Sequence, residues 1–254
     1  MNALVITVII FACLFGGGVA GLLLKRRLPD HHLSPETRDV VRLAAGLIGT
    51  LAALVLGLLI ASANSSFNAR DQEIKQAGVD LILLDRTMRY YGPETTEIRA
   101  LLRQGVARAI DLHWPKEEGK RVASREDPEG GFLLERAIEL IRNLKPGDDA
   151  HRSQQNRALQ IGGELSRTHW LLIEQSGSSI PTAFLVFLVF WVAMIFASFG
   201  LFAPCNTTVI AALFVCSVSI AGSIFLILEM DAPLHGLIKI SGAPLHSALS
   251  YLNQ

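Results

Sequence analysis

Four long apolar runs interrupt an otherwise polar chain of 254 residues. They cover Ala3–Leu24, Leu43–Ala61, Ile180–Ala203 and Thr207–Leu228. Each run is close to the twenty or so residues that an α-helix needs to cross the hydrocarbon core of a bilayer. The pattern therefore predicts four transmembrane helices, arranged as two pairs on either side of one long polar stretch.

The polar stretch has the periodicity of amphipathic helices. Phe67, Ile74, Leu81 and Met88 recur every seven residues, so the second span is predicted to continue as one helix to about Tyr90. Three further helices are predicted over residues 93–114, 132–144 and 148–174. Residues 64–179 are therefore expected to form an extramembrane helical domain between the transmembrane pairs of residues 1–63 and 180–229.

A short segment, residues 230–254, follows the last span. Pro233 cannot continue a helix, and apolar residues recur at helical spacing from Leu245 onward. This pattern predicts a short amphipathic helix that lies at the membrane interface. The predicted fold class is all-α: a polytopic membrane protein with four transmembrane helices and an extramembrane helical bundle.

The charged residues are segregated along the chain in the same way. Of the 46 charged residues, 35 lie between Asn64 and Gly177, where 17 are basic and 18 are acidic, and none lies between Ile180 and Leu228. A formal net charge of zero argues against a nucleic-acid-binding protein, which normally carries a basic face. The expected partner is the lipid bilayer.

Basic residues in short loops predict the orientation of a membrane protein. The first loop contains Lys25, Arg26, Arg27, Arg38 and Arg42, whereas the N-terminal tail and the turn at residues 203–206 contain none. This distribution places the first loop in the cytoplasm. The helical domain and both termini are then predicted to lie on the opposite side of the membrane, outside the cytoplasm.

The second span contains a repeat of small residues. Ala45, Gly49, Ala53, Gly57 and Ala61 follow one another at intervals of four. Small residues let helix backbones approach closely in a membrane. Either this helix packs against another span of the same chain, or it is the central helix of a homo-oligomer and faces a pore.

Two acids, Glu229 and Asp231, follow the fourth span, where the helix macrodipole disfavours negative charge. They mark either a simple membrane boundary or a functional element. In the second interpretation they form a ring at a pore mouth or hold the C-terminal segment against the helical domain. A ring of acids favours cations over anions.

No motif of a known catalytic or cofactor chemistry is found. The sequence lacks a Ser–His–Asp order, a Walker loop and a Gly-rich dinucleotide turn, and His113, His151 and His169 are scattered. No metal site, cofactor or enzymatic activity is therefore predicted.

The order of spans and the C-terminal sequence resemble the bestrophin-like family, bacterial membrane proteins without an assigned function. Its most specific element is an acidic-x-Pro-x-x-Gly sequence followed by Ser-x-x-Pro. The matching residues are Asp231, Pro233, Gly236, Ser241 and Pro244. The sequences YGPE at 91–94, LHWP at 112–115 and SSIP at 178–181 are also similar.

The resemblance implies a distant relation to bestrophins, which are oligomeric anion channels. Bestrophins keep their large helical domain in the cytoplasm, which is opposite to the orientation predicted from charge. The leading hypothesis is a homo-oligomeric channel for inorganic ions, with a pore lined by the second span. The alternative is a membrane-anchored sensor or scaffold, whose helical domain binds a ligand or partner without ion conduction.

Overall fold

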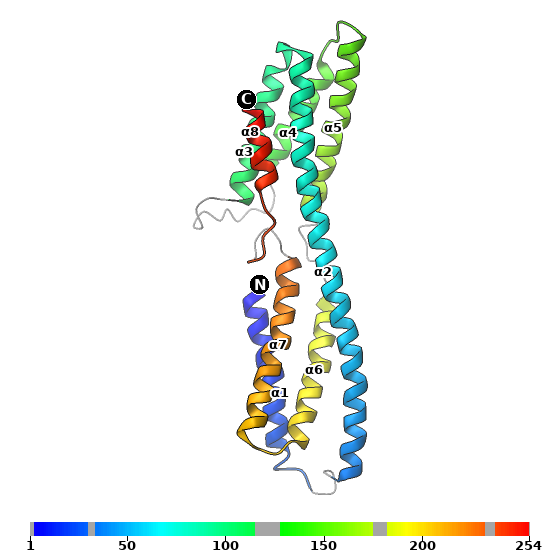
Figure 1. Ribbon diagram of the computed structural model, residues 1–254, viewed down its shortest axis with the longest axis vertical. Coiled ribbons are helices and arrows are strands. Elements are labelled where there is room, and N and C mark those ends of the chain that lie inside the picture. The colour runs from blue at the N-terminus through cyan, green and yellow to red at the C-terminus, as the bar shows by residue number, and fades with distance from the viewer. Residues whose placement is uncertain (1–2, 30–33, 115–127, 175–181, 232–236, 254) are drawn as a thin grey trace. The chain divides into compact units, whose positions relative to one another are not determined.

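The computed structural model describes all residues except 1–2, 30–33, 115–127, 175–181, 232–236 and 254. Every regular element in these described residues is a helix, which confirms the all-α fold class (Figure 1). The elements are α1 (Ala3–Leu24), α2 (Pro35–Tyr91), the short 3₁₀-helix η2 (Pro93–Thr95), α3 (Thr96–His113), α4 (Pro128–Asn143), α5 (Asp149–Glu174), α6 (Thr182–Phe202), α7 (Thr207–Asp231) and α8 (Ala243–Leu252).

The chain forms two compact units. We call Met1–Ser66 with Ser178–Ile238 the membrane unit, and Phe67–Gly177 with Lys239–Gln254 the helical unit. Helix α2 contributes residues to both units, because the heptad pattern continues the second span without a break.

The membrane unit contains the four predicted spans. Within the described residues, the helices long and apolar enough to cross a membrane are α1, α2, α6 and α7. Helix α1 packs on both α6 and α7. Phe11 and Phe15 of α1 meet Phe214 of α7 edge to face, with ring centroids 5.5 and 5.8 Å apart. Such aromatic contacts add specific attraction to the dispersion that holds membrane helices together.

Glycines set the distance between α1 and α6. A Cβ atom at Gly17 would lie 3.2 Å from the backbone oxygen of Ala193. A Cβ atom at Gly21 would collide with the backbone oxygen of Ala197, and one at Gly200 with that of Gly18. The backbones are therefore in direct contact, as small residues permit in membranes.

The helical unit has its own core. The predicted seam on α2 is buried at Ile74, Leu81 and Met88, and Leu84 is fully enclosed. Apolar faces of α3, α4 and α5 complete this core. Helix α4 begins at Pro128, four residues before the predicted start, so the Gly130–Gly131 pair is helical rather than a turn. Gly131 leaves space for His169, whose Nε2 would lie 2.8 Å from an added Cβ.

Helix α8 belongs to the helical unit. Ala248 and Leu252 have no exposed surface and lie in the same core as Leu84 and Met88. The predicted short amphipathic helix is thus present, and protein covers its apolar face. An amphipathic pattern shows that one face of a helix is apolar, but not whether protein or lipid covers that face.

Asp148 fixes the start of α5. Its Oδ1 accepts the backbone N–H of His151 at 2.7 Å and lies 2.6 Å from His151 Nδ1. The backbone hydrogen bond lowers the pKa of Asp148, and the side-chain hydrogen bond to Asp148 raises the pKa of His151. The carboxylate is thus an N-cap, which explains why the helix begins where the sequence predicts.

Candidate functional site

The five small residues of the second span lie in different environments. Ala45 is buried and Gly49 is half-buried, whereas Ala53, Gly57 and Ala61 are exposed. Four residues turn an α-helix by about 400°, so the repeat moves about 40° around the helix at every step. The predicted stripe therefore winds from the face covered by the chain to the opposite face.

A different set of α2 residues faces the other helices of the membrane unit. Ala45, Ala52, Leu59 and Ala63 are buried, with spacings of seven, seven and four. These spacings keep residues within about 40° of one another on a helix, which the four-residue repeat does not. Of the small residues, Gly57 and Ala61 are left on a surface that the chain does not cover.

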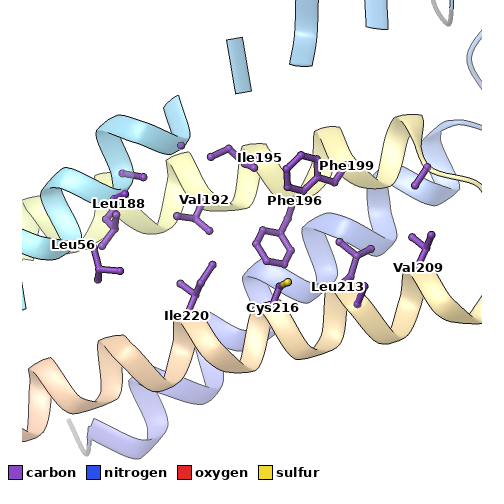
Figure 2. Close-up of a pocket in the computed structure, with 15 residues that line it drawn as sticks. Leu56, Leu188, Val192, Ile195, Phe196, Phe199, Val209, Leu213, Cys216 and Ile220 are labelled. Atoms are coloured by element: carbon purple, nitrogen blue, oxygen red, sulfur yellow. The ribbon is translucent and has the colours of Figure 1, made fainter. Parts of the chain in front are cut away.

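An apolar groove of about 480 Å³ lies between α2, α6 and α7 in the membrane unit. Its α2 wall consists of Gly49, Ala52, Ala53 and Leu56. The remaining lining lies within 188–199 of α6 and 209–220 of α7, with Ala203 just after α6. Figure 2 shows Phe196 of α6 and Cys216 of α7 pointing toward one another across it. The lining is almost wholly hydrocarbon, so the groove offers dispersion contacts and no ion-binding group.

Two basic side chains bind the C-terminal end of α6, at one end of this groove. Lys25 Nζ donates to the Ala203 carbonyl at 3.0 Å, and Arg38 Nη2 donates to the Phe202 carbonyl at 3.1 Å. Ala203 is itself a lining residue. Cations at a helix C-terminus satisfy carbonyls that have no partner within the helix and complement its dipole.

The two acids predicted as a possible ion mouth are buried in the last turn of α7. Glu229 is 7% and Asp231 is 8% exposed. The Glu229 carboxylate accepts the backbone N–H of Leu237. This hydrogen bond provides the compensation that a negative charge needs at a helix C-terminus. The Glu229 carboxylate is thus engaged within its own chain. Pro233 and Gly236 lie outside the described residues.

The rest of the C-terminal element, Ser241 and Pro244, lies in the helical unit. Ser241 Oγ accepts the backbone N–H of Ala243 at 3.2 Å, just before α8. Pro244 packs against α2, where a Cβ added to Gly78 would lie 3.0 Å from the Pro244 carbonyl oxygen. This part of the element therefore positions α8 on α2.

Trp114, the residue that follows α3, also contacts the segment before α8. Its Nε1 donates to the Ile240 carbonyl at 2.8 Å, and its ring leaves no space for a side chain at Gly242. The LHWP sequence contains Trp114, but its sequence alone predicts no contact for this side chain. A tryptophan beside a helix-ending proline was the available signal, but its partner is 126 residues away.

Titratable side chains form no obvious reaction centre in the described part of the chain. No group of three His, Cys, Asp or Glu residues is found there in an arrangement that could hold a metal ion. Cys13, Cys205 and Cys216 are exposed free thiols. The features available for function are therefore the exposed face of α2, the apolar groove and the basic residues at its end.

Comparison with known proteins identifies the family. Residues 12–245 match the model of the bestrophin-like domain. The structure is similar to that of a point mutant of a bacterial bestrophin homologue from Klebsiella pneumoniae, with a TM-score of 0.70 at 12% identity, over 98% of this chain and 99% of the other. None of the curated proteins matches this chain significantly in sequence. Because the family model covers nearly the whole sequence, the chain belongs to the bestrophin-like family.

Proposed function

We propose that this protein is a homo-oligomeric channel for inorganic ions, with a pore around α2. Membership of the bestrophin-like family is the observation that carries the proposal. The bestrophin fold of the Klebsiella homologue supports it at the level of architecture. The bilayer of a bacterial inner membrane is the expected environment, because four helices have the length and composition of spans.

The exposed face of α2 supports the choice of this helix for the pore. Gly57 and Ala61 are exposed among the described residues, and a Cβ at Gly57 would meet nothing within 4 Å. In a symmetric ring, each copy offers the same face to the axis or to its neighbour. Small side chains there allow several helices to approach one axis without filling it.

Gly57→Leu is expected to reduce ion flux through reconstituted protein to near the background of empty liposomes. Several leucines at one level of a narrow pore form a hydrophobic constriction, which gates by dewetting. Gly222→Leu in α7 is the matched control, because a Cβ there also meets nothing within 4 Å. Equal flux through both variants would contradict a pore lined by α2.

An electron cryomicroscopy map of the purified protein tests the assembly directly. The proposal predicts a ring of subunits with an open axis, lined by α2 at the level of Gly57 and Ala61. A monomer, or a ring whose axis is sealed and gives no flux, would contradict the channel. That result would favour a sensor or scaffold, which a ligand-dependent shift in melting temperature would then identify.

For the orientation, we propose that the loop between α1 and α2 is cytoplasmic and the helical unit periplasmic. The basic residues at this end support this proposal: Lys25, Arg26 and Arg27 in the loop, and Arg38 and Arg42 in the first turns of α2. Cys205 lies in the turn between α6 and α7, at the same end of the membrane unit as Lys25 and Arg38. It is exposed, so it can report which side of the membrane this end faces.

In a Cys13→Ser, Cys216→Ser background, a membrane-impermeant maleimide should label Cys205 in inside-out vesicles and leave it unmodified in right-side-out vesicles. A Ser153→Cys variant without the other cysteines should give the opposite result, because Ser153 is an exposed residue of the helical unit. The reverse pattern at both positions would place the helical unit in the cytoplasm, as in bestrophins.

A further inference from the structure

The apolar groove has the depth of one leaflet of a bilayer. Its lining on α7 runs from Val209 to Ile220, which spans about 16 Å at 1.5 Å per residue. The hydrocarbon core is about 30 Å thick, so this length is about half of it. The groove begins beside the turn between α6 and α7, because its lining residue Val209 lies in the first turn of α7. A lipid acyl chain that enters the groove from that side would end near the middle of the bilayer.

The groove is too small to enclose another transmembrane helix. A helix about 10 Å wide occupies roughly 120 Å³ per residue, so 480 Å³ would hold only about four residues. A single acyl chain is much thinner and adapts its shape along the whole length. If nothing fills the groove, its lining loses dispersion contacts, which are the main attraction available to apolar side chains in lipid.

The membrane-surface end of the groove is basic. Lys25 and Arg38 are held there by the carbonyls of Ala203 and Phe202. An ammonium has three donors and a guanidinium five, so each side chain keeps donors for a further acceptor. Arg38 Nε is buried and has no hydrogen-bond partner in the described part of the chain. A phosphate oxygen is the acceptor that arginine and lysine recognise best.

The surroundings of these two side chains add to the positive potential. Across residues 25–42 the chain has five basic residues against three acids, Asp30, Glu36 and Asp39. Asp39 is engaged with Arg42 at 3.9 Å. The N-termini of α2 and α7 lie at this end together with the C-termini of α1 and α6, so the helix dipoles largely cancel there and the net positive charge comes from the side chains. Basic pockets between transmembrane helices are a recurrent mode of binding to lipid headgroups.

We propose that the membrane unit binds an anionic glycerophospholipid as a structural ligand. One acyl chain occupies the groove between α2, α6 and α7, and the phosphate interacts with Lys25 and Arg38. The lipid thereby connects α2 to α6 and α7 through contacts that the chain lacks by itself. This binding does not require the protein to conduct ions, so it is tested separately from the channel.

Native mass spectrometry with equal phosphatidylglycerol and phosphatidylcholine tests the site. The wild type should retain phosphatidylglycerol, one molecule per subunit, in preference to phosphatidylcholine. Ala212→Phe, and independently Cys216→Phe, should displace it, because both residues line the groove. Ala211→Phe is the matched control, since Ala211 is exposed on the same helix and does not line the groove. Equal retention by all three variants would overturn the proposal.

The headgroup contact is tested with a second pair of variants. Lys25→Gln with Arg38→Gln should abolish the preference for phosphatidylglycerol, while one lipid per subunit is still retained, because the acyl groove is intact. Arg152→Gln in the helical unit controls for the loss of positive charge and should leave the preference unchanged. An unchanged preference in the double variant, or equal retention of both lipids by the wild type, would overturn the anionic headgroup.

A second copy of the chain is the competing occupant, and Cys216 distinguishes the two. In a Cys13→Ser, Cys205→Ser background, Cys216 carries a photoactivatable maleimide into the groove. Illumination in phosphatidylglycerol nanodiscs should add the mass of one lipid to the chain. A covalent dimer instead of a lipid adduct would show that a neighbouring subunit fills the groove and would overturn the proposal.

Discussion

Gly21→Ala and Gly200→Ala should each severely destabilise the membrane unit, whereas Gly16→Ala should leave it intact. A Cβ at Gly21 would collide with the Ala197 carbonyl and lie 2.9 Å from the Leu201 nitrogen. A Cβ at Gly200 would collide with the Gly18 carbonyl and lie 3.0 Å from the Leu22 nitrogen. Backbone cannot rotate away as a side chain can, so the two helices must separate.

The expected loss is at least about 3 kcal/mol, the upper end of the usual range for overpacking. At Gly16 a Cβ meets nothing within 4 Å, so the same substitution on the same helix is a matched control. Thermal unfolding of purified protein in one detergent, followed by loss of the monodisperse peak in size-exclusion chromatography, provides the measurement. A melting temperature for Gly21→Ala equal to that of Gly16→Ala would mean that α1 and α6 are further apart than described.

Asp85→Ala should be the most damaging single change in the helical unit. Asp85 is 4% exposed, and its carboxylate binds Arg99 through two hydrogen bonds, at 2.7 and 3.3 Å. Arg89 adds a longer contact of 3.4 Å. The pair joins α2 to α3, and removing the acid leaves the Arg99 guanidinium, whose side chain is 20% exposed, without its principal partner.

Breaking a buried ion pair from one side costs about 3–5 kcal/mol, and the partial exposure of Arg99 places the expected cost near the lower value. Glu139→Ala is the control, because its pair with Arg136 is exposed on both sides and such pairs contribute about 1 kcal/mol or less. Hydrogen–deuterium exchange on the full-length protein should show faster exchange in α3 for Asp85→Ala alone. Unchanged α3 protection would indicate that apolar packing, not the ion pair, holds α3 to α2.

Local sequence patterns predicted the helices well, because these depend on neighbours in the chain. The apolar runs placed α1 at its observed bounds, and the heptad of Phe67, Ile74, Leu81 and Met88 correctly extended α2 to the YGPE turn. Asp148 marked the start of α5 through a local N-cap.

Contacts between distant segments could not be predicted from the sequence patterns. The repeat of small residues from Ala45 to Ala61 does not by itself show which of these residues are covered. Only the packed helix distinguishes covered from uncovered residues. Glu229 was recognised as an unfavourable charge, but its partner, the Leu237 N–H eight residues further on, was not predicted. Trp114 and Ile240 are joined by a hydrogen bond across 126 residues, which no local pattern encodes.

The sequence by itself thus determined which segments are helical, which of them suit a bilayer, and that a separate helical unit lies between the two pairs of spans. Hydrophobic length, heptad spacing and caps are sufficient for this, since each acts over a few residues. Only the tertiary structure decided which apolar face meets protein. It buried α8 in the helical unit, turned Gly57 and Ala61 outward, and left a groove whose end is basic, because packing joins residues far apart in the chain.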